Sequence, residues 1–288
     1  MHHRKLNIGA VCATLLFSAT ALFAQDAAQQ PVRLVTLGGA VTEIVYALGM
    51  GEQIVGVDSS SAYPEPARAL PQVGYHRALS AEGVLSLKPT MILMTEAAGP
   101  PDAIEQIRQS GVETLSVTDQ TSLEGCVERI AKIAAALHKS EAGAQLAQSI
   151  QERLRAIEAL NAQQAKRPKT LFIFAQSEHS LTVAGTQTAA DAIIRLAGGE
   201  NVVADYAGYR PFNAESAVEL RPEVIIICAH NANGDLSQQK IVAHPGMQLT
   251  PAVKNNRVRT LDTSYLLNFG PRLGAAARDL HQALYAAQ

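Results

Sequence analysis

Residues 74–89 read GYHRALSAEGVLSLKP, and residues 208–222 read GYRPFNAESAVELRP, so nearly the same stretch occurs twice in this chain of 288 residues. A short apolar run follows each copy, MILM at residues 91–94 and VIII at residues 224–227. An internal repeat of this length predicts two similar structural units. Two such lobes facing one another would form a cleft, to which each lobe contributes a tyrosine and an arginine.

Short apolar segments alternate with helical patterns on both sides of the repeat, which is typical of an α/β protein with mainly parallel sheets covered by helices. Ser80 is a suitable N-cap for a helix that ends near Leu87, and Asn213 would cap its counterpart at residues 214–220. We expect strands at residues 33–37, 54–57, 91–94, 113–117, 170–174, 201–203, 224–227 and 257–261, and further helices at residues 38–48, 101–110, 123–137, 188–197 and 271–286.

Residues 140–164 contain no proline and carry apolar side chains along one helical stripe, which predicts a long helix between the two lobes. We therefore expect an N-terminal lobe at residues 32–138, a linking helix at 139–167 and a C-terminal lobe at 168–288. A continuous helix packed along both lobes resists bending, so we expect only a modest closure on ligand binding.

The N-terminus reads as a secretory signal peptide at residues 1–24, because a basic start precedes an apolar stretch and the polar pair Gln25-Asp26 follows Ala24. An uncleaved membrane anchor is the alternative, but the apolar core is short. Cleavage would remove Arg4 and Lys5 and take the formal net charge from −2 to about −4, which offers no electrostatic footprint for nucleic acid. We expect an exported, periplasmic protein that is a monomer.

The motifs of common enzymes are missing from this sequence. It has no Gly-x-Ser-x-Gly elbow, Walker loop or dinucleotide fingerprint, which weighs against a secreted hydrolase. Cys126 falls in a helical pattern and Cys228 ends an apolar strand, so we expect two buried structural thiols and no disulfide between them. We expect no catalytic residue.

Three stretches carry a resemblance to a known family: residues 73–85, residues 183–191 (VAGTQTAAD) and residues 269–272 (FGPR). With them the chain resembles the periplasmic substrate-binding proteins of ABC importers that have a single backbone helix, a group that handles siderophores, cobalamin and heme. Residues 73–85 look like the signature of its heme-binding members. The resemblance implies a class III periplasmic binding protein that captures ferric heme between its lobes and delivers it to an inner-membrane ABC importer.

Tyr75 is the iron ligand that this resemblance implies. Ferric iron is a hard Lewis acid, and tyrosine is a recognised axial ligand of heme iron. A free phenol titrates near 10, so ligation at neutral pH needs the metal and a nearby positive charge, which Arg77 is placed to supply. The alternative is a loop tyrosine whose ring anchors against its own lobe.

Tyr209 and Arg210 are the second-lobe counterparts, where Arg210 could pair with a heme propionate and Tyr209 could stack on the porphyrin or ligate weakly. Their spacing to the following apolar residue is shorter by one than in the first copy. His76 and His179 are candidates for a second axial bond or for binding a second heme, although a structural or surface role is favoured for His76. Some members of the family use a histidine in the C-lobe, near residues 183–191 of this chain, but this segment carries Gln187 and no histidine here. The difference favours five-coordinate iron on Tyr75.

Glu82 and Glu215 occupy the same position in the two copies. The resemblance implies that each carboxylate docks on one half of a twofold-symmetric permease; the alternative is a favourable interaction with a helix dipole. A siderophore or cobalamin binder of the same transporter class is the nearest rival, although the absence of Trp and an aromatic content of 5% argue against cobalamin. A heme-sensing module also stays open, as does the number of hemes.

Overall fold

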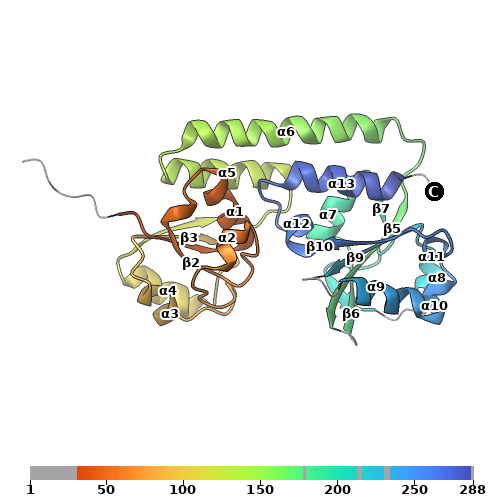
Figure 1. Ribbon diagram of the computed structural model, residues 1–288, viewed down its shortest axis with the longest axis horizontal. Coiled ribbons are helices and arrows are strands. Elements are labelled where there is room, and N and C mark those ends of the chain that lie inside the picture. Colours follow the sequence, from red (N-terminus) through yellow and green to blue (C-terminus); the bar gives the residue numbers. More distant parts are fainter. Residues whose placement is uncertain (1–30, 178–179, 213–215, 230–233, 287–288) are drawn as a thin grey trace, which may run out of the picture. The chain divides into compact units, whose positions relative to one another are not determined.

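Two sheets with their own helices make up the computed structural model, which describes residues 31–177, 180–212, 216–229 and 234–286 (Figure 1). The expected signal peptide lies outside these residues. No helix in the described ranges is long and apolar enough to cross a membrane. The two-lobe α/β architecture expected from the repeat is confirmed, since the strands that follow the two copies, at residues 91–95 and 224–229, belong to different sheets.

The first sheet is entirely parallel, with the strand order β2-β1-β3-β4. Each connection between neighbouring strands is helical, as parallel pairing requires. The elements of this lobe are β1 (Leu34–Leu37), α1 (Gly39–Ala47), the 3-10 helix η1 (Gly51–Gln53), β2 (Ile54–Val57), α2 (Glu65–Arg68), α3 (Ala81–Ser86), β3 (Met91–Thr95), α4 (Pro101–Gln109), β4 (Glu113–Val117) and α5 (Leu123–Ala136).

The second sheet is mixed, in the order β10-β9-β5-β6-β8 with β7 beside β5. Strands β10, β9 and β5 are parallel, whereas β6 and β8 add antiparallel pairs at one edge. Its elements are β5 (Lys169–Ser177), β6 (Ser180–Ala184), α7 (Ala189–Leu196), β7 (Glu200–Asn201), β8 (Tyr209–Pro211), α8 (Ser216–Leu220), β9 (Val224–Ala229), α9 (Gly234–Ala243), α10 (Pro245–Gln248), α11 (Pro251–Lys254), β10 (Val258–Asp262), α12 (Thr263–Leu267) and α13 (Leu273–Tyr285).

The second Gly-Tyr stretch is not among the expected strands, but Tyr209–Pro211 forms the edge strand β8 on β6. Strand β6 and helices α9 to α12 were not predicted either. Apart from α9, these elements have only four or five residues, and the pairing of an edge strand depends on its neighbour more than on its own sequence.

The linking helix α6 (Ser140–Ala162) follows the predicted stripe. Its buried positions recur at intervals of three and four residues, and α6 packs on α5 and α13, alongside which it runs in Figure 1. Gly143 leaves room for Ala134 of α5, where an added Cβ would lie 2.4 Å from the alanine methyl.

A shared core lies beneath α6 and joins the two sheets. Alternate strand residues of both sheets face it, for example Leu34 in β1 and Phe172 in β5, while their neighbours Val35 and Leu171 face a separate core in each lobe. Cys126 and Cys228 are free, buried thiols in the shared core, as expected.

The repeat has a backbone signature at both ends. Gly74 and Gly208 have φ angles of +93° and +84°, and Lys88 and Arg221, each before a proline, have +50° and +46°. A positive φ favours glycine, which is the residue at the first position of both copies. Ser80 caps α3 as predicted, because its Oγ accepts the Gly83 N–H at 3.3 Å; residues 213–215, with the proposed Asn213 cap, lie outside the described ranges.

Candidate functional site

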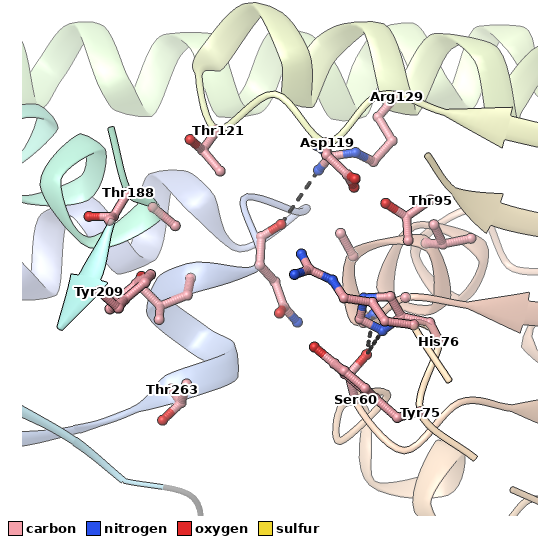
Figure 2. A pocket seen from close by; sticks show the side chains of 18 of the residues that line it. Ser60, Tyr75, His76, Thr95, Asp119, Thr121, Arg129, Thr188, Tyr209 and Thr263 are labelled. Carbon is pink, nitrogen blue, oxygen red and sulfur yellow. Dashed lines mark hydrogen bonds between the residues drawn. The ribbon is translucent and has the colours of Figure 1, made fainter. Parts of the chain in front are cut away.

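A pocket of about 730 Å³ lies between the two sheets' lobes. This volume falls within the range of roughly 300–1,000 Å³ usual for small-molecule and cofactor sites. Figure 2 shows Ser60, Tyr75 and His76 on one side and Thr188 and Tyr209 on the other. The lining residues are Gly38–Val41, Ser60, Tyr75–Arg77, Thr95, Asp119, Thr121 and Arg129 from the first lobe, and Phe174, Gln187–Ala189, Tyr209, Thr263, Leu267 and Asn268 from the second.

The first Gly-Tyr loop is held by backbone hydrogen bonds on both sides. Gly74 O accepts from Ser59 N, and His76 O accepts from Gly99 N, each at 2.8 Å. The Tyr75 carbonyl accepts from Ala78 N at 2.8 Å and closes a tight turn. The loop before α3 is therefore fixed, although it belongs to no sheet.

The Tyr75 side chain is 47% exposed and lines the pocket. Its ring centroid lies 4.4 Å from that of His76, with a tilt of 59°. Arg77 also lines the pocket and is exposed, and no ion pair within the described ranges neutralises it. The structure therefore brings the predicted ligand and the predicted cation into one pocket.

Tyr209 lines the same pocket from β8 and is 43% exposed. Its ring lies 6.4 Å from that of Phe174. Burial of the phenol raises the pKa of Tyr209, and hydrogen bonds with the Ala190 backbone and the Thr188 side chain partly offset this. Tyr209 thus has partners in its own lobe at the start of α7.

Arg210 is not among the pocket-lining residues. Successive residues of a strand point to opposite faces, and the Arg210 guanidinium lies over the ring of Tyr206, 4.2 Å from its centroid. The structure therefore does not bring Arg210 together with Tyr75 and Arg77.

The predicted docking carboxylates are placed in part. Glu82 is exposed in the first turn of α3, and Glu215 lies outside the described residues, as does His179. Gln187 lines the pocket with a φ of +58°. No three His, Cys, Asp or Glu side chains gather as a metal site in the described parts of the chain.

Several residues of the site were missed from the sequence. Asp58, which directly follows β2, is completely buried and binds the imidazole of His76 at 2.9 Å. Its position was the available signal, because the carboxyl ends of parallel strands meet at the crevice where α/β proteins bind ligands. His76 has the structural role expected, but it also lines the pocket.

Hydrogen bonds of two lining residues, Asn268 and Arg129, and an ion pair of Arg272, which does not line the pocket, connect the lobes. Asn268 donates to Glu43 at 2.9 Å, and Arg272 forms a two-pronged ion pair with the same carboxylate, at 2.7 and 2.9 Å. Arg129 of α5 donates to the Phe269 carbonyl at 2.9 Å. No sequence pattern announces these contacts, because Glu43 and Arg272 lie 229 positions apart.

Comparisons with known proteins agree with this arrangement. Residues 34–265 match the family model described as periplasmic binding protein. The apo structure of the periplasmic heme-binding protein RhuT from Roseiflexus sp. RS-1 is similar at 39% identity, with a TM-score of 0.82 and coverage of 88% of this chain and 98% of that one.

A periplasmic heme-binding protein from Pseudomonas aeruginosa is similar at 31% identity and a TM-score of 0.81, covering 90% of this chain and 94% of that one. The vitamin B12-binding protein of Vibrio vulnificus strain CMCP6 is 27% identical over 89% of this chain and 92% of its own length.

Proposed function

We propose that this chain, which belongs to the periplasmic binding protein family, captures ferric heme between its lobes and delivers it to an ABC importer. The observation that carries the proposal is that Tyr75, which is half-exposed, and the exposed cation Arg77 line the same interlobe pocket. A phenolate is a hard anionic donor suited to ferric iron, and tyrosine serves as an axial heme ligand elsewhere.

The surroundings of Tyr75 suit a porphyrin with two carboxylates. Phe174, Leu267 and Val41 supply apolar wall, against which a flat macrocycle can be buried. Arg77 can form a charge-assisted hydrogen bond to a propionate. Tyr209 faces the ligand from the second lobe as an aromatic wall, since its hydroxyl already has partners.

Cobalamin is the second candidate, because a vitamin B12-binding protein is among the relatives. The two solved heme-binding proteins named above are more similar, at 31% and 39% identity against 27%. A chain without Trp also offers few large aromatic walls for a corrin. Heme is therefore the better supported ligand.

The test is an absorption titration of the chain from Gln25 onward with hemin and, separately, with cyanocobalamin. We expect saturable hemin binding with a high-spin ferric tyrosinate spectrum, which is lost in Tyr75→Phe. Tyr285→Phe is the matched control, because that phenol donates to the Gly198 carbonyl at 2.8 Å outside the pocket. Binding of cyanocobalamin alone, or an unchanged spectrum in Tyr75→Phe, would refute the proposal.

Delivery is the second half of the proposed function. Glu82 is exposed on α3 of the first lobe, and Glu215 stands at the same position of the second copy. One carboxylate on each lobe suits a partner with twofold symmetry. The double variant Glu82→Ala with Glu215→Ala should bind hemin normally and abolish hemin uptake by cells; unimpaired uptake would contradict the docking role.

A further inference from the structure

The Asp58 carboxylate accepts hydrogen bonds from three residues that line the pocket, Gly38, Ser60 and His76. It follows β2 directly, and its side chain has no exposure. Oδ1 accepts the Gly38 N–H at 2.9 Å and the Ser61 hydroxyl at 2.8 Å. Oδ2 accepts from Ser60, through N–H at 3.1 Å and Oγ at 2.7 Å, and from His76, through N–H at 3.3 Å and Nδ1 at 2.9 Å.

These donors come from three separate segments that border the pocket. Gly38 is the N-cap residue of α1, Ser60 belongs to the loop after β2, and His76 belongs to the Gly-Tyr loop. Burial by itself would raise the pKa of Asp58, but the hydrogen bonds from His76, Ser60, Gly38 and Ser61 lower it to about 2. The carboxylate is therefore ionised at neutral pH and joins the three segments.

His76 connects the fixed Asp58 carboxylate to the Tyr75 ring. Because ionised Asp58 can only accept, the His76 Nδ1 must donate to it, which sets the tautomer and the orientation of the ring. The His76 side chain is 12% exposed, whereas Tyr75 is about half exposed. The imidazole is the aromatic neighbour of the Tyr75 ring, at 4.4 Å between centroids.

We infer that Asp58 and His76 are positioning residues for the Tyr75 ligand, and this inference rests on the proposed function. Asp58 orients His76, and the His76 ring limits the directions that the exposed phenol of Tyr75 can take. The phenol oxygen then meets iron without first losing the freedom of an unrestrained loop side chain. Partners that orient a metal ligand typically contribute about 10- to 100-fold to metal affinity.

Three variants test the contact between Asp58 and His76 and the contact between His76 and Tyr75. Asp58→Asn keeps the shape of the carboxylate but removes its charge. His76→Asn keeps a donor near Nδ1 but removes the ring, and His76→Phe keeps a ring but removes the donor. Asp279→Asn is the control, since this carboxylate accepts the Tyr265 hydroxyl at 2.7 Å away from the pocket.

The measurement is the rate at which bound hemin passes to excess apomyoglobin. We expect each of the three variants to lose hemin about 10- to 100-fold faster than the unaltered protein, while Asp279→Asn does not. Combining Asp58→Asn with His76→Phe should add little to either change, because coupled residues are not additive.

An acid titration of the bound tyrosinate spectrum provides a readout that a purely structural role would not move. A weaker iron–phenolate bond competes less well with protonation, so the midpoint should shift to higher pH in the three variants. Circular dichroism at the same temperature confirms that each variant is folded. Unchanged transfer rates and midpoints in folded His76→Asn and His76→Phe would overturn the inference. If the unaltered protein itself showed no tyrosinate ligation of hemin, the proposed function would be overturned instead.

Discussion

The two Gly-Tyr stretches begin with the same backbone and end in different structures. Gly74 and Gly208 share a positive φ, yet Tyr75 stands in a loop fastened through Asp58 and His76, and Tyr209 stands in β8 beside β6. The Tyr209 hydroxyl has partners in Thr188 and Ala190. This pair shows that two copies of one motif can share a local backbone conformation. The residues that contact each tyrosine differ, and they determine what that tyrosine can do chemically.

The two tyrosines can line one pocket only while the two lobes are held together. The largest loss of stability should therefore come from removing the ion pair that joins the lobes. Glu43 is buried, and Glu43→Ala would leave Arg272, whose side chain is 20% exposed, without its carboxylate. Breaking a buried pair costs about 3–5 kcal/mol, so the midpoint of urea unfolding should fall strongly.

The control for this loss is Lys132→Ala, which removes an exposed pair with Glu128. Surface pairs contribute about 0–1 kcal/mol, so its unfolding should be nearly normal. Equal stability of Glu43→Ala and Lys132→Ala would show that the lobes are held by the shared core and α6 alone.

The two phenols themselves should differ in hemin affinity. We expect Tyr75→Phe to weaken hemin binding by about a hundredfold, or about 2.7 kcal/mol, because the iron ligand is lost. Tyr209→Phe keeps an aromatic wall and should weaken binding only a few-fold. Equal losses in equilibrium titrations would mean that both lobes ligate iron and that the comparison fails.

Lowering the pH should weaken the contacts that hold the first Gly-Tyr stretch more than those that hold the second. The pKa of Asp58 is lowered to about 2 in the folded protein, so its hydrogen bonds stabilise the fold above pH 4, and this contribution is lost as the pH falls towards 2. With about 1.4 kcal/mol per pKa unit, it amounts to about 2 kcal/mol.

Urea unfolding at several pH values measures this contribution. Between pH 5 and 2.5 the free energy of unfolding of Asp58→Asn should fall less steeply than that of the unaltered protein. Parallel slopes would contradict the pKa of Asp58 on which the comparison relies.

The smallest effects should come from the two glycines, which form a matched pair. A Cβ at Gly74 would lie no closer than 3.8 Å to another residue, and one at Gly208 would meet nothing within 4 Å. Each Gly→Ala change therefore costs only backbone strain, about 1–2 kcal/mol. Thermal unfolding should show similar losses, but hemin release should accelerate in Gly74→Ala alone.

Much of the architecture could be predicted because it follows local rules. The alternation of strands and helices, the stripe of α6 and the Ser80 cap depend on residues within a few positions of one another. The edge strands β6 and β8 could not be predicted in this way. Their residues become strands by pairing with one another, and a sequence pattern does not show that pairing.

The candidate site divides in the same manner. Tyr75 and Arg77 could be proposed from a stretch of a few residues, and the structure places both at one pocket. Asp58 was missed although it precedes His76 by only 18 positions, because the loop between them folds back in three dimensions. Arg210 stands beside Tyr209 in the sequence but is carried to the other face of the edge strand.

The sequence by itself determined that two similar α/β units would stand on either side of one long helix, because hydrophobic period and turn chemistry are local properties of the chain. Only the tertiary structure decided that Tyr75 would rest against an imidazole held by a buried carboxylate while Tyr209 would bond within its own lobe. Burial, hydrogen-bond partners and strand faces arise when distant segments meet, and these contacts set the orientation and the ionisation of each group.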